Sequence, residues 1–207
     1  MPSDTADAYG RLPSFVLGFH GCDRKVAADL VSGRRQPTVS QNQYDWLGTG
    51  IYFWENNPSR ALTFARELVG KKRSGKETIK RPAVVGAVMD LGYCFNLLDA
   101  KFLRILRDGY EILKETFEEA GRALPANRPL RGSHELLLRD LDCAVINGVH
   151  AFRAAQNLPA FDTVRSAFIE GGELFPGSAI REKNHIQICV CNPSSIKGYF
   201  RPLADLD

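Results

Sequence analysis

The stretch Tyr44-Asp45-Trp46-Leu47-Gly48-Thr49-Gly50-Ile51-Tyr52-Phe53 places a tyrosine inside a glycine-led apolar run. Earlier in the chain, Phe15-Val16-Leu17-Gly18-Phe19 forms a second apolar run, which His20 and Gly21 follow directly. Short apolar runs of this kind are typical of buried strands. Because Val or Ile would serve folding better than His20 and Tyr52, these two side chains are the first candidates for a function.

Strand and helix patterns alternate along the rest of the chain. Apolar runs and period-two alternation predict strands over 15–19, 48–53, 82–89, 162–169, 185–191 and 196–201. Helical spacing predicts helices over 26–31, 58–68, 102–117 and 136–146, with Asp23 and Asn57 as caps of the first two. Strands cluster toward the C-terminal end. The pattern predicts an α+β fold around a strand-rich core.

The composition is that of a globular protein with one domain. At 207 residues, 44% hydrophobic and 25% charged, the chain suits a single domain over 14–207, preceded by a flexible lead-in over 1–13. The lead-in has no apolar segment typical of a signal peptide, and no stretch is long enough to span a membrane. We therefore expect a soluble, cytoplasmic protein with no membrane partner. Five cysteines without a CxxC pair predict neither a disulfide framework nor a zinc site.

Charge is unevenly distributed, although the net charge is only +3. The segment between Arg66 and Arg81 contains two glutamates and five basic residues. The basic residues are Lys71, Lys72, Arg73, Lys76 and Lys80. A solvated loop is the simpler interpretation of such a run. A phosphate-rich partner is the alternative.

The four histidines have different settings. His134 and His150 lie in or beside helical segments, where a structural role is the better interpretation. His20 is placed at a strand end before Gly21, which lets a ligand approach the backbone closely. His185 and Gln187 are two residues apart on a predicted strand, so both point to one face.

Other catalytic motifs are missing from the chain. It has no Gly-x-Gly-x-x-Gly after a strand, no phosphate loop ending in Gly-Lys-Ser/Thr, and no His-Glu-x-x-His. A Cys-His hydrolase built on His20 and Cys22 is weakly supported. No local spacing supports metal ligation by His20, His185 and a carboxylate, so no metal is expected.

The two opening motifs together resemble the ADP-ribosyltransferase superfamily, on its poly(ADP-ribose)-polymerase-like branch and near bacterial toxin-like members. That branch has His-Gly at the end of its first strand, a Gly-x-Gly-Ile-Tyr-Phe strand, and a third polar residue on a later strand. The matches here are His20-Gly21, Gly48–Phe53 and a third position within Asn184–Gln187. The likeness covers residues 15–68, with a continuation over 160–201. It implies split antiparallel β-sheets with flanking helices.

The resemblance also implies a role for each matched residue, with NAD as substrate. His20 would bond the ribose 2′-hydroxyl, and the backbone of Gly21 the nicotinamide carboxamide. Tyr52 would stack on the nicotinamide, beside Gly50 and Phe53 of the same motif. Phe64 would supply a second aromatic wall. Outside the matched motifs, Arg165 could bind a pyrophosphate, with a surface arginine as the alternative interpretation. The serine of the family's next helix corresponds approximately to Ala61, so one carboxamide contact is missing.

The third position departs from the family. Polymerising members have a glutamate there, whereas this chain offers Gln187 or His185. Glutamine can orient a group but cannot act as a base, so chain elongation is not expected. Glu170 or Glu173 could instead accept the proton of an incoming nucleophile.

We therefore predict a NAD-dependent mono-ADP-ribosyltransferase. Its macromolecular acceptor is a nucleic acid or a protein, and the basic segment slightly favours nucleic acid. A toxin-like member would have an antitoxin as a partner. Two alternatives stay open: an RNA 2′-phosphotransferase of the same fold, and a catalytically silent domain that binds NAD or ADP-ribose.

Overall fold

A computed structural model describes residues 15–71, 78–130, 132 and 134–203. The predicted flexible lead-in over 1–13 lies outside these residues, as do Lys72, Arg73 and Lys76 of the basic segment. None of the helices in the described part of the chain offers an apolar stretch long enough to cross a membrane.

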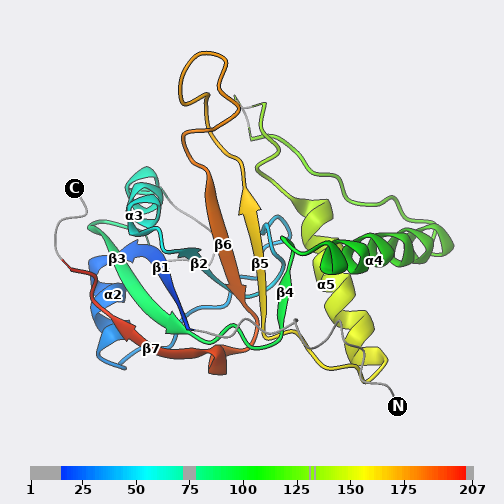
Figure 1. The fold of residues 1–207 in the computed structure, drawn as a ribbon, viewed down its shortest axis with the longest axis horizontal. Coiled ribbons are helices and arrows are strands. Elements are labelled where there is room, and N and C mark those ends of the chain that lie inside the picture. Colours follow the sequence, from blue (N-terminus) through cyan, green and yellow to red (C-terminus); the bar gives the residue numbers. More distant parts are fainter. Residues whose placement is uncertain (1–14, 72–77, 131, 133, 204–207) are drawn as a thin grey trace.

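Seven strands form one sheet in the order β4-β5-β6-β2-β1-β3-β7 (Figure 1). The strands are β1 (Val16–Asp23), β2 (Ile51–Glu55), β3 (Pro82–Met89), β4 (Cys94–Asn96), β5 (Thr163–Phe168), β6 (His185–Val190) and β7 (Ile196–Phe200). Neighbours are antiparallel except β4 and β5, which run parallel. The predicted α+β class is confirmed in this coarse form. The finer expectation of split antiparallel β-sheets is not confirmed: the seven strands form one sheet, and the unanticipated short strand β4 pairs in parallel with β5.

β1 and β2 share fewer paired residues than any other two neighbouring strands of the sheet. These strands pair only at Gly18 with Glu55 and at Phe19 with Trp54. In contrast, β1 pairs with β3 along its whole length, from Val16 to Asp23. The sheet is therefore one hydrogen-bonded unit made of two halves, β1-β3-β7 and β4-β5-β6-β2, held by two residue pairs.

Within the described residues, four α-helices pack against the two faces of the sheet. They are α2 (Arg24–Val31), α3 (Pro58–Glu67), α4 (Ala100–Glu119) and α5 (Asp140–Ala155). Buried residues of α3, α4 and α5 pack on the face that carries Trp54 and Val164. Ala27 and Leu30 of α2 instead join Cys22 and Val85 on the opposite face. In Figure 1, α2 and α3 lie toward the β1-β3 half, and α4 and α5 lie toward β4 and β5.

Local signals located most of these elements. Asp23 caps α2 by accepting the backbone N–H of Lys25, and Asn57 caps α3 with Pro58 in its first turn, both as predicted. The helix expected from Leu136 begins only at Asp140. The strand expected to end at Phe19 continues to Asp23, because β3 supplies a partner for the whole segment. His20 therefore lies within β1, not at its end.

Candidate functional site

His20 lies where β1 and β2 part. Its ring contacts Phe53 edge-on, with 5.9 Å between ring centroids. Its Nδ1–H donates to the backbone oxygen of Tyr52 over 2.8 Å. This bond places the proton on Nδ1 and anchors the imidazole to β2 at the position just beyond the last paired residues, Phe19 and Trp54.

Gly21 packs against α3 so closely that no side chain would fit. A Cβ atom built on Gly21 would lie 2.0 Å from the backbone oxygen of Ala61. The backbone N–H of Asn56 donates to the carbonyl of Leu17, so the backbone groups of alternate residues, Leu17, Phe19 and Gly21, face β2. Because the β1-β2 ladder stops at Phe19, the Gly21 peptide edge faces the parted strands.

Tyr52 is held rigidly from within the protein. Its hydroxyl donates to the carbonyl of Gly48 and accepts from the backbone N–H of Leu47. Burial raises the pKa of the phenol, so the group stays neutral and its hydrogen bonds persist. The ring packs beside the apolar cluster of Leu47 and Cys189. Tyr52 is therefore an oriented ring and not an acid or a base.

The two residues considered for the third position lie on the Tyr52 face. Gln187 stands directly opposite Trp54 of β2 and Ser166 of β5. His185 stands opposite Phe168, two residues away along β6. Since cross-strand partners and alternate residues share a face, Tyr52, Gln187 and His185 lie on one side of the sheet. Pairing does not choose between Gln187 and His185.

A buried ion pair borders these residues. Arg60 of α3 donates through Nη2 to both carboxylate oxygens of Glu170, at 3.1 and 2.9 Å. The two side chains are only 8% and 12% exposed. The guanidinium also lies 5.6 Å from the centroid of the Trp54 ring. The pair ties the segment after β5 to the start of α3.

His185 is enclosed by this ion pair and by aromatic rings. Its Nδ1–H donates to the backbone oxygen of Lys183 over 2.6 Å, and Nδ1 lies 3.8 Å from Oε2 of Glu170. Rings of Trp46, Trp54 and Phe168 have centroids within 5.7–6.3 Å of its own. Burial, above all, lowers the pKa of the imidazole, and Arg60 and Arg139 lower it further, while the Lys183 carbonyl and Glu170 oppose them. The ring is neutral at neutral pH.

This pKa shift predicts a loss of stability in acid. Below pH 6.5, the ordinary value, the unfolded chain takes up a proton that folded His185 does not. Neutral His185 therefore makes its full contribution to the free energy of unfolding above pH 6.5. This contribution falls as the pH drops toward the folded pKa, by at most about 1.4 kcal/mol per pH unit. Urea denaturation at a series of pH values should show a steeper acid loss for the wild type than for His185→Gln. Parallel curves would contradict the assignment.

The other predicted site residues are dispersed. Phe64 packs on Trp54, with 4.9 Å between ring centroids. Phe53 is 1% exposed in the core of the opposite face. On that same face Arg165 is engaged by Glu55 through two nitrogens. Gly50 is required for packing, because a Cβ there would lie 2.4 Å from Sγ of Cys189.

Glu173 does not join the cluster around His185. It is exposed, accepts the backbone N–H of Gly177, and lies 3.8 Å from Arg181. Its partners belong to the loop between β5 and β6, which extends beyond the sheet in Figure 1. The structure therefore brings Glu170 to His185 and leaves Glu173 in the loop.

His150 contacts a cysteine instead of filling a purely apolar site. Its Nε2 lies 3.8 Å from Sγ of Cys191, and Phe161 packs edge-on against its ring. The Cys189 thiol and then His150 lower the pKa of Cys191. His134 is exposed and lies outside the helices.

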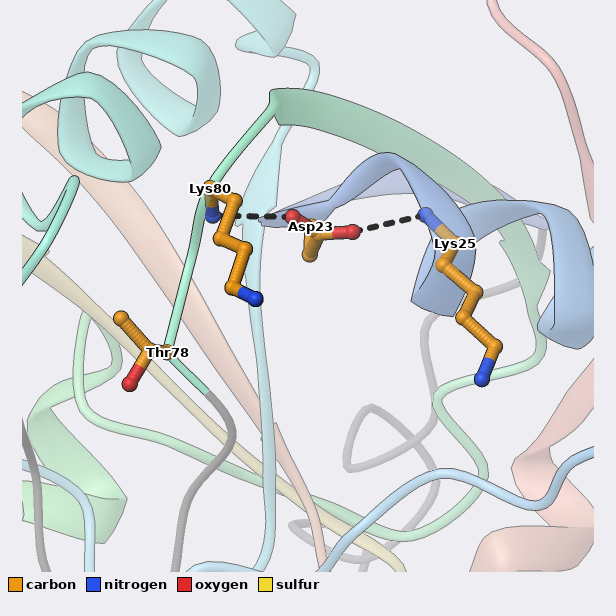
Figure 2. A pocket seen from close by; sticks show the side chains of 4 residues that line it. All are labelled: Asp23, Lys25, Thr78 and Lys80. Carbon is orange, nitrogen blue, oxygen red and sulfur yellow. Dashed lines mark hydrogen bonds between the residues drawn. The ribbon is translucent and has the colours of Figure 1, made fainter.

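A surface hollow lies at the end of β1, lined by Asp23, Lys25, Thr78 and Lys80. Figure 2 shows the backbone nitrogens of Lys25 and Lys80 bonded to the Asp23 carboxylate. Arg81 adds a third backbone N–H. Burial alone would raise the pKa of Asp23, but these three donors lower it. The Asp23 carboxylate already accepts hydrogen bonds that join the start of α2 to the start of β3. A structural role therefore accounts for its position in the hollow.

Sequence reasoning missed Arg60, Arg139, Trp46 and Trp54 as neighbours of His185. Arg60 follows the cap of a helix, where an exposed arginine is the usual expectation, and only tertiary packing buries it. No family model, curated protein or solved structure matches the chain. Within the described residues, no group of three or more His, Cys, Asp or Glu side chains is arranged to hold a metal ion.

Proposed function

We propose that this protein is a NAD-dependent mono-ADP-ribosyltransferase. One observation carries the proposal: β1 and β2 part immediately after Phe19 and Trp54, at the His-Gly motif of one strand and the tyrosine of the other. A ladder that stops inside a sheet leaves peptide edges that the neighbouring strand does not pair, and buried peptide groups need partners. A bound carboxamide would bond the Gly21 peptide edge that faces the parted strands, as an added strand does at a sheet edge.

The parted strands reconcile the positions of His20 and Tyr52. By ladder position the two side chains belong to opposite faces, and the His20 ring packs on Phe53 of the face opposite Tyr52. Its Nδ1–H nevertheless reaches across to the Tyr52 carbonyl, so the two residues meet at the gap. The Tyr52 hydroxyl is saturated by Leu47 and Gly48, which leaves the ring face for stacking. These features suit a nicotinamide riboside held edge-on by Gly21 and flat against Tyr52.

The proposed chemistry depends on a site that holds the ribose and the nicotinamide leaving group in a fixed orientation. Breaking the bond between C1′ and nicotinamide builds positive charge on the ribose, and nicotinamide leaves with the bonding electron pair. A site that orients both groups lowers this barrier without supplying a covalent nucleophile. Gln187, on the Tyr52 face, can hydrogen-bond the ribose but cannot remove a proton. Transfer of one ADP-ribose unit, without elongation, fits this residue.

Release of nicotinamide from NAD tests the proposal. We expect the His20→Ala variant to release nicotinamide about 100-fold more slowly than the wild type, the size of loss seen when one oriented donor of a catalytic site is removed. Gln187→Ala should also slow release. His134→Ala, an exposed histidine outside the helices, is the matched control and should retain the wild-type rate.

Two results would contradict the proposal in different ways. Equal release by the wild type, His20→Ala and Gln187→Ala would mean that the site lies elsewhere. NAD binding in calorimetry without any release would indicate the catalytically silent alternative.

A further inference from the structure

Polar atoms without hydrogen-bond partners are concentrated around His185. Six buried side-chain nitrogen or oxygen atoms lack a partner in the described part of the chain, and five of them belong to this region. These five are Nε1 of Trp54, Nε and Nη1 of Arg60, Nε of Arg139 and Nε2 of His185. Folded proteins satisfy nearly all buried polar atoms, so a concentration of exceptions calls for a missing partner.

The five atoms include both an acceptor and donors. The Nδ1–H of His185 is already donated to Lys183, so in the neutral ring Nε2 is a bare acceptor. The other four atoms are N–H donors. Residue exposure is 8% for Arg60, 7% for His185 and 4% for Trp54, so bulk solvent barely reaches these side chains. A ligand that fits must carry oxygen or nitrogen acceptors together with at least one donor hydrogen.

The charges of the region are already balanced. Arg60 is paired with Glu170 at 2.9 Å and Arg139 with Asp142 at 3.3 Å, and His185 is neutral. A buried phosphate would bring in one or two negative charges with no remaining cation to compensate them, which is strongly unfavourable. The ligand that suits the region is therefore neutral.

Aromatic rings surround the set. The Arg139 guanidinium lies 4.4 Å from the centroid of the Trp46 ring and 5.0 Å from that of Phe168. Trp46 and His185 have nearly parallel planes, 24° apart. Aromatic and guanidinium planes are the surfaces on which unstacked nucleobases are bound. Trp46 is only partly buried and the Arg139 side chain is 26% exposed, so this is the more exposed side of the cluster.

We propose that this cluster, Trp46, Trp54, Arg60, Arg139, Phe168 and His185, binds the acceptor nucleobase of a single-stranded nucleic acid, with His185 as its general base. The proposal rests on the transferase function above and names its acceptor. Guanine and uracil carry a carbonyl oxygen beside an N–H, which matches N–H donors beside a bare Nε2. Adenine and cytosine have no ring N–H next to a carbonyl.

The transfer step balances as follows. The bond from C1′ of the ribose to nicotinamide breaks, and nicotinamide leaves with the electron pair. The base nitrogen forms the new bond to C1′ and gives its proton to Nε2 of His185. The resulting imidazolium has the Glu170 carboxylate 3.8 Å from Nδ1, which stabilises the positive charge. Release of the proton to water restores the neutral histidine, so His185 supplies the base that Gln187 cannot.

The test measures transferred ADP-ribose and released nicotinamide in the same reaction. Labelled NAD is incubated with short single-stranded RNA oligonucleotides that contain only uridine, only adenosine or only cytidine, or a mixed sequence with guanosine. We expect label on the uridine or guanosine oligonucleotides only. We expect the ratio of transfer to nicotinamide release to fall about 100-fold in His185→Gln. The wild-type transfer rate should decline in acid as His185 becomes protonated. The pH profile of the variant should lack this decline, the acid limb.

Two further variants separate a chemical role from a folding defect. Trp54→Phe keeps an aromatic side chain but removes the N–H donor together with the five-membered part of the indole, so it should raise KM for the oligonucleotide about tenfold. His150→Gln changes a histidine outside the cluster and should leave both readouts at the wild-type level.

The outcomes distinguish the two proposals. If the wild type releases no nicotinamide, the transferase function itself fails. If it releases nicotinamide but His185→Gln transfers with the wild-type ratio and acid limb, the role of His185 is overturned. Label found on proteins of a cell extract and on none of the oligonucleotides would overturn the nucleobase as acceptor.

Discussion

Replacing Arg60 with methionine is expected to lower the free energy of unfolding by about 3–5 kcal/mol. Methionine keeps much of the side-chain volume but leaves the Glu170 carboxylate, 12% exposed, without its cation. An uncompensated buried charge is among the most destabilising products of a single substitution. Urea denaturation of the purified variant gives the change directly. The size of the effect depends on burial, which only the folded structure supplies.

A double variant isolates the charge from the packing. Arg60→Met combined with Glu170→Gln contains no buried charge in this pair, so most of the lost stability should return. The control is Arg34→Met. Arg34 pairs with Asp29 while 67% exposed, and its loss should change stability by less than about 1 kcal/mol. Equal losses for Arg60→Met and Arg34→Met would mean that the Arg60–Glu170 pair is not buried in solution.

Substituting Gly21 with alanine should cost about 3 kcal/mol, near the upper end for overpacking. The added Cβ would lie 2.0 Å from the Ala61 carbonyl oxygen, and this atom belongs to the hydrogen-bonded backbone of α3, which cannot rotate away as a side chain would. Either α3 or β1 must move. Because the proposed carboxamide contact uses the Gly21 peptide, nicotinamide release should be lost together with stability.

Gly198→Ala provides the matched control for Gly21→Ala. Gly198 also lies in a strand, but a Cβ at that position meets no heavy atom within 4 Å, so stability should change by less than about 0.5 kcal/mol. Thermal and urea unfolding test the expected loss of stability, and nicotinamide release tests the expected loss of activity. A Gly21→Ala protein with wild-type stability would show that β1 and α3 are farther apart than described here.

Much of the secondary structure could be predicted from local signals. The strand over 82–89 has the predicted bounds because its apolar run is continuous and ends at Pro82 and Asp90. The starts of α2 and α3 follow from Asp23 and Asn57, whose side chains accept the first free backbone N–H groups. Cap chemistry acts over a few residues, so it is readable without the fold. The three-residue strand β4 has too little pattern of its own to be found this way.

Only some residues of the candidate site could likewise be identified from local sequence signals. The residue types that suggest NAD, His20-Gly21 and Tyr52, are visible in the sequence by their contrast with the apolar runs that carry them. Glu170 and Glu173 were indistinguishable there, since both occupy one turn-rich loop. Packing separates them: Glu170 is drawn to Arg60 beside His185, and Glu173 bonds within its loop.

The sequence by itself determined the α+β class and the starts of α2 and α3, and it contains the two motifs on which the NAD proposal rests, because strand period, capping and turn residues act over short distances. Only the tertiary structure decided that β1 and β2 part beside His20. It alone buried Arg60 and brought Trp46, Trp54 and Arg139 around His185. The physical reason is that these features depend on pairing and burial between segments far apart in the sequence, such as Arg60 and Glu170. Desolvation and unpaired hydrogen bonds arise only when such segments meet.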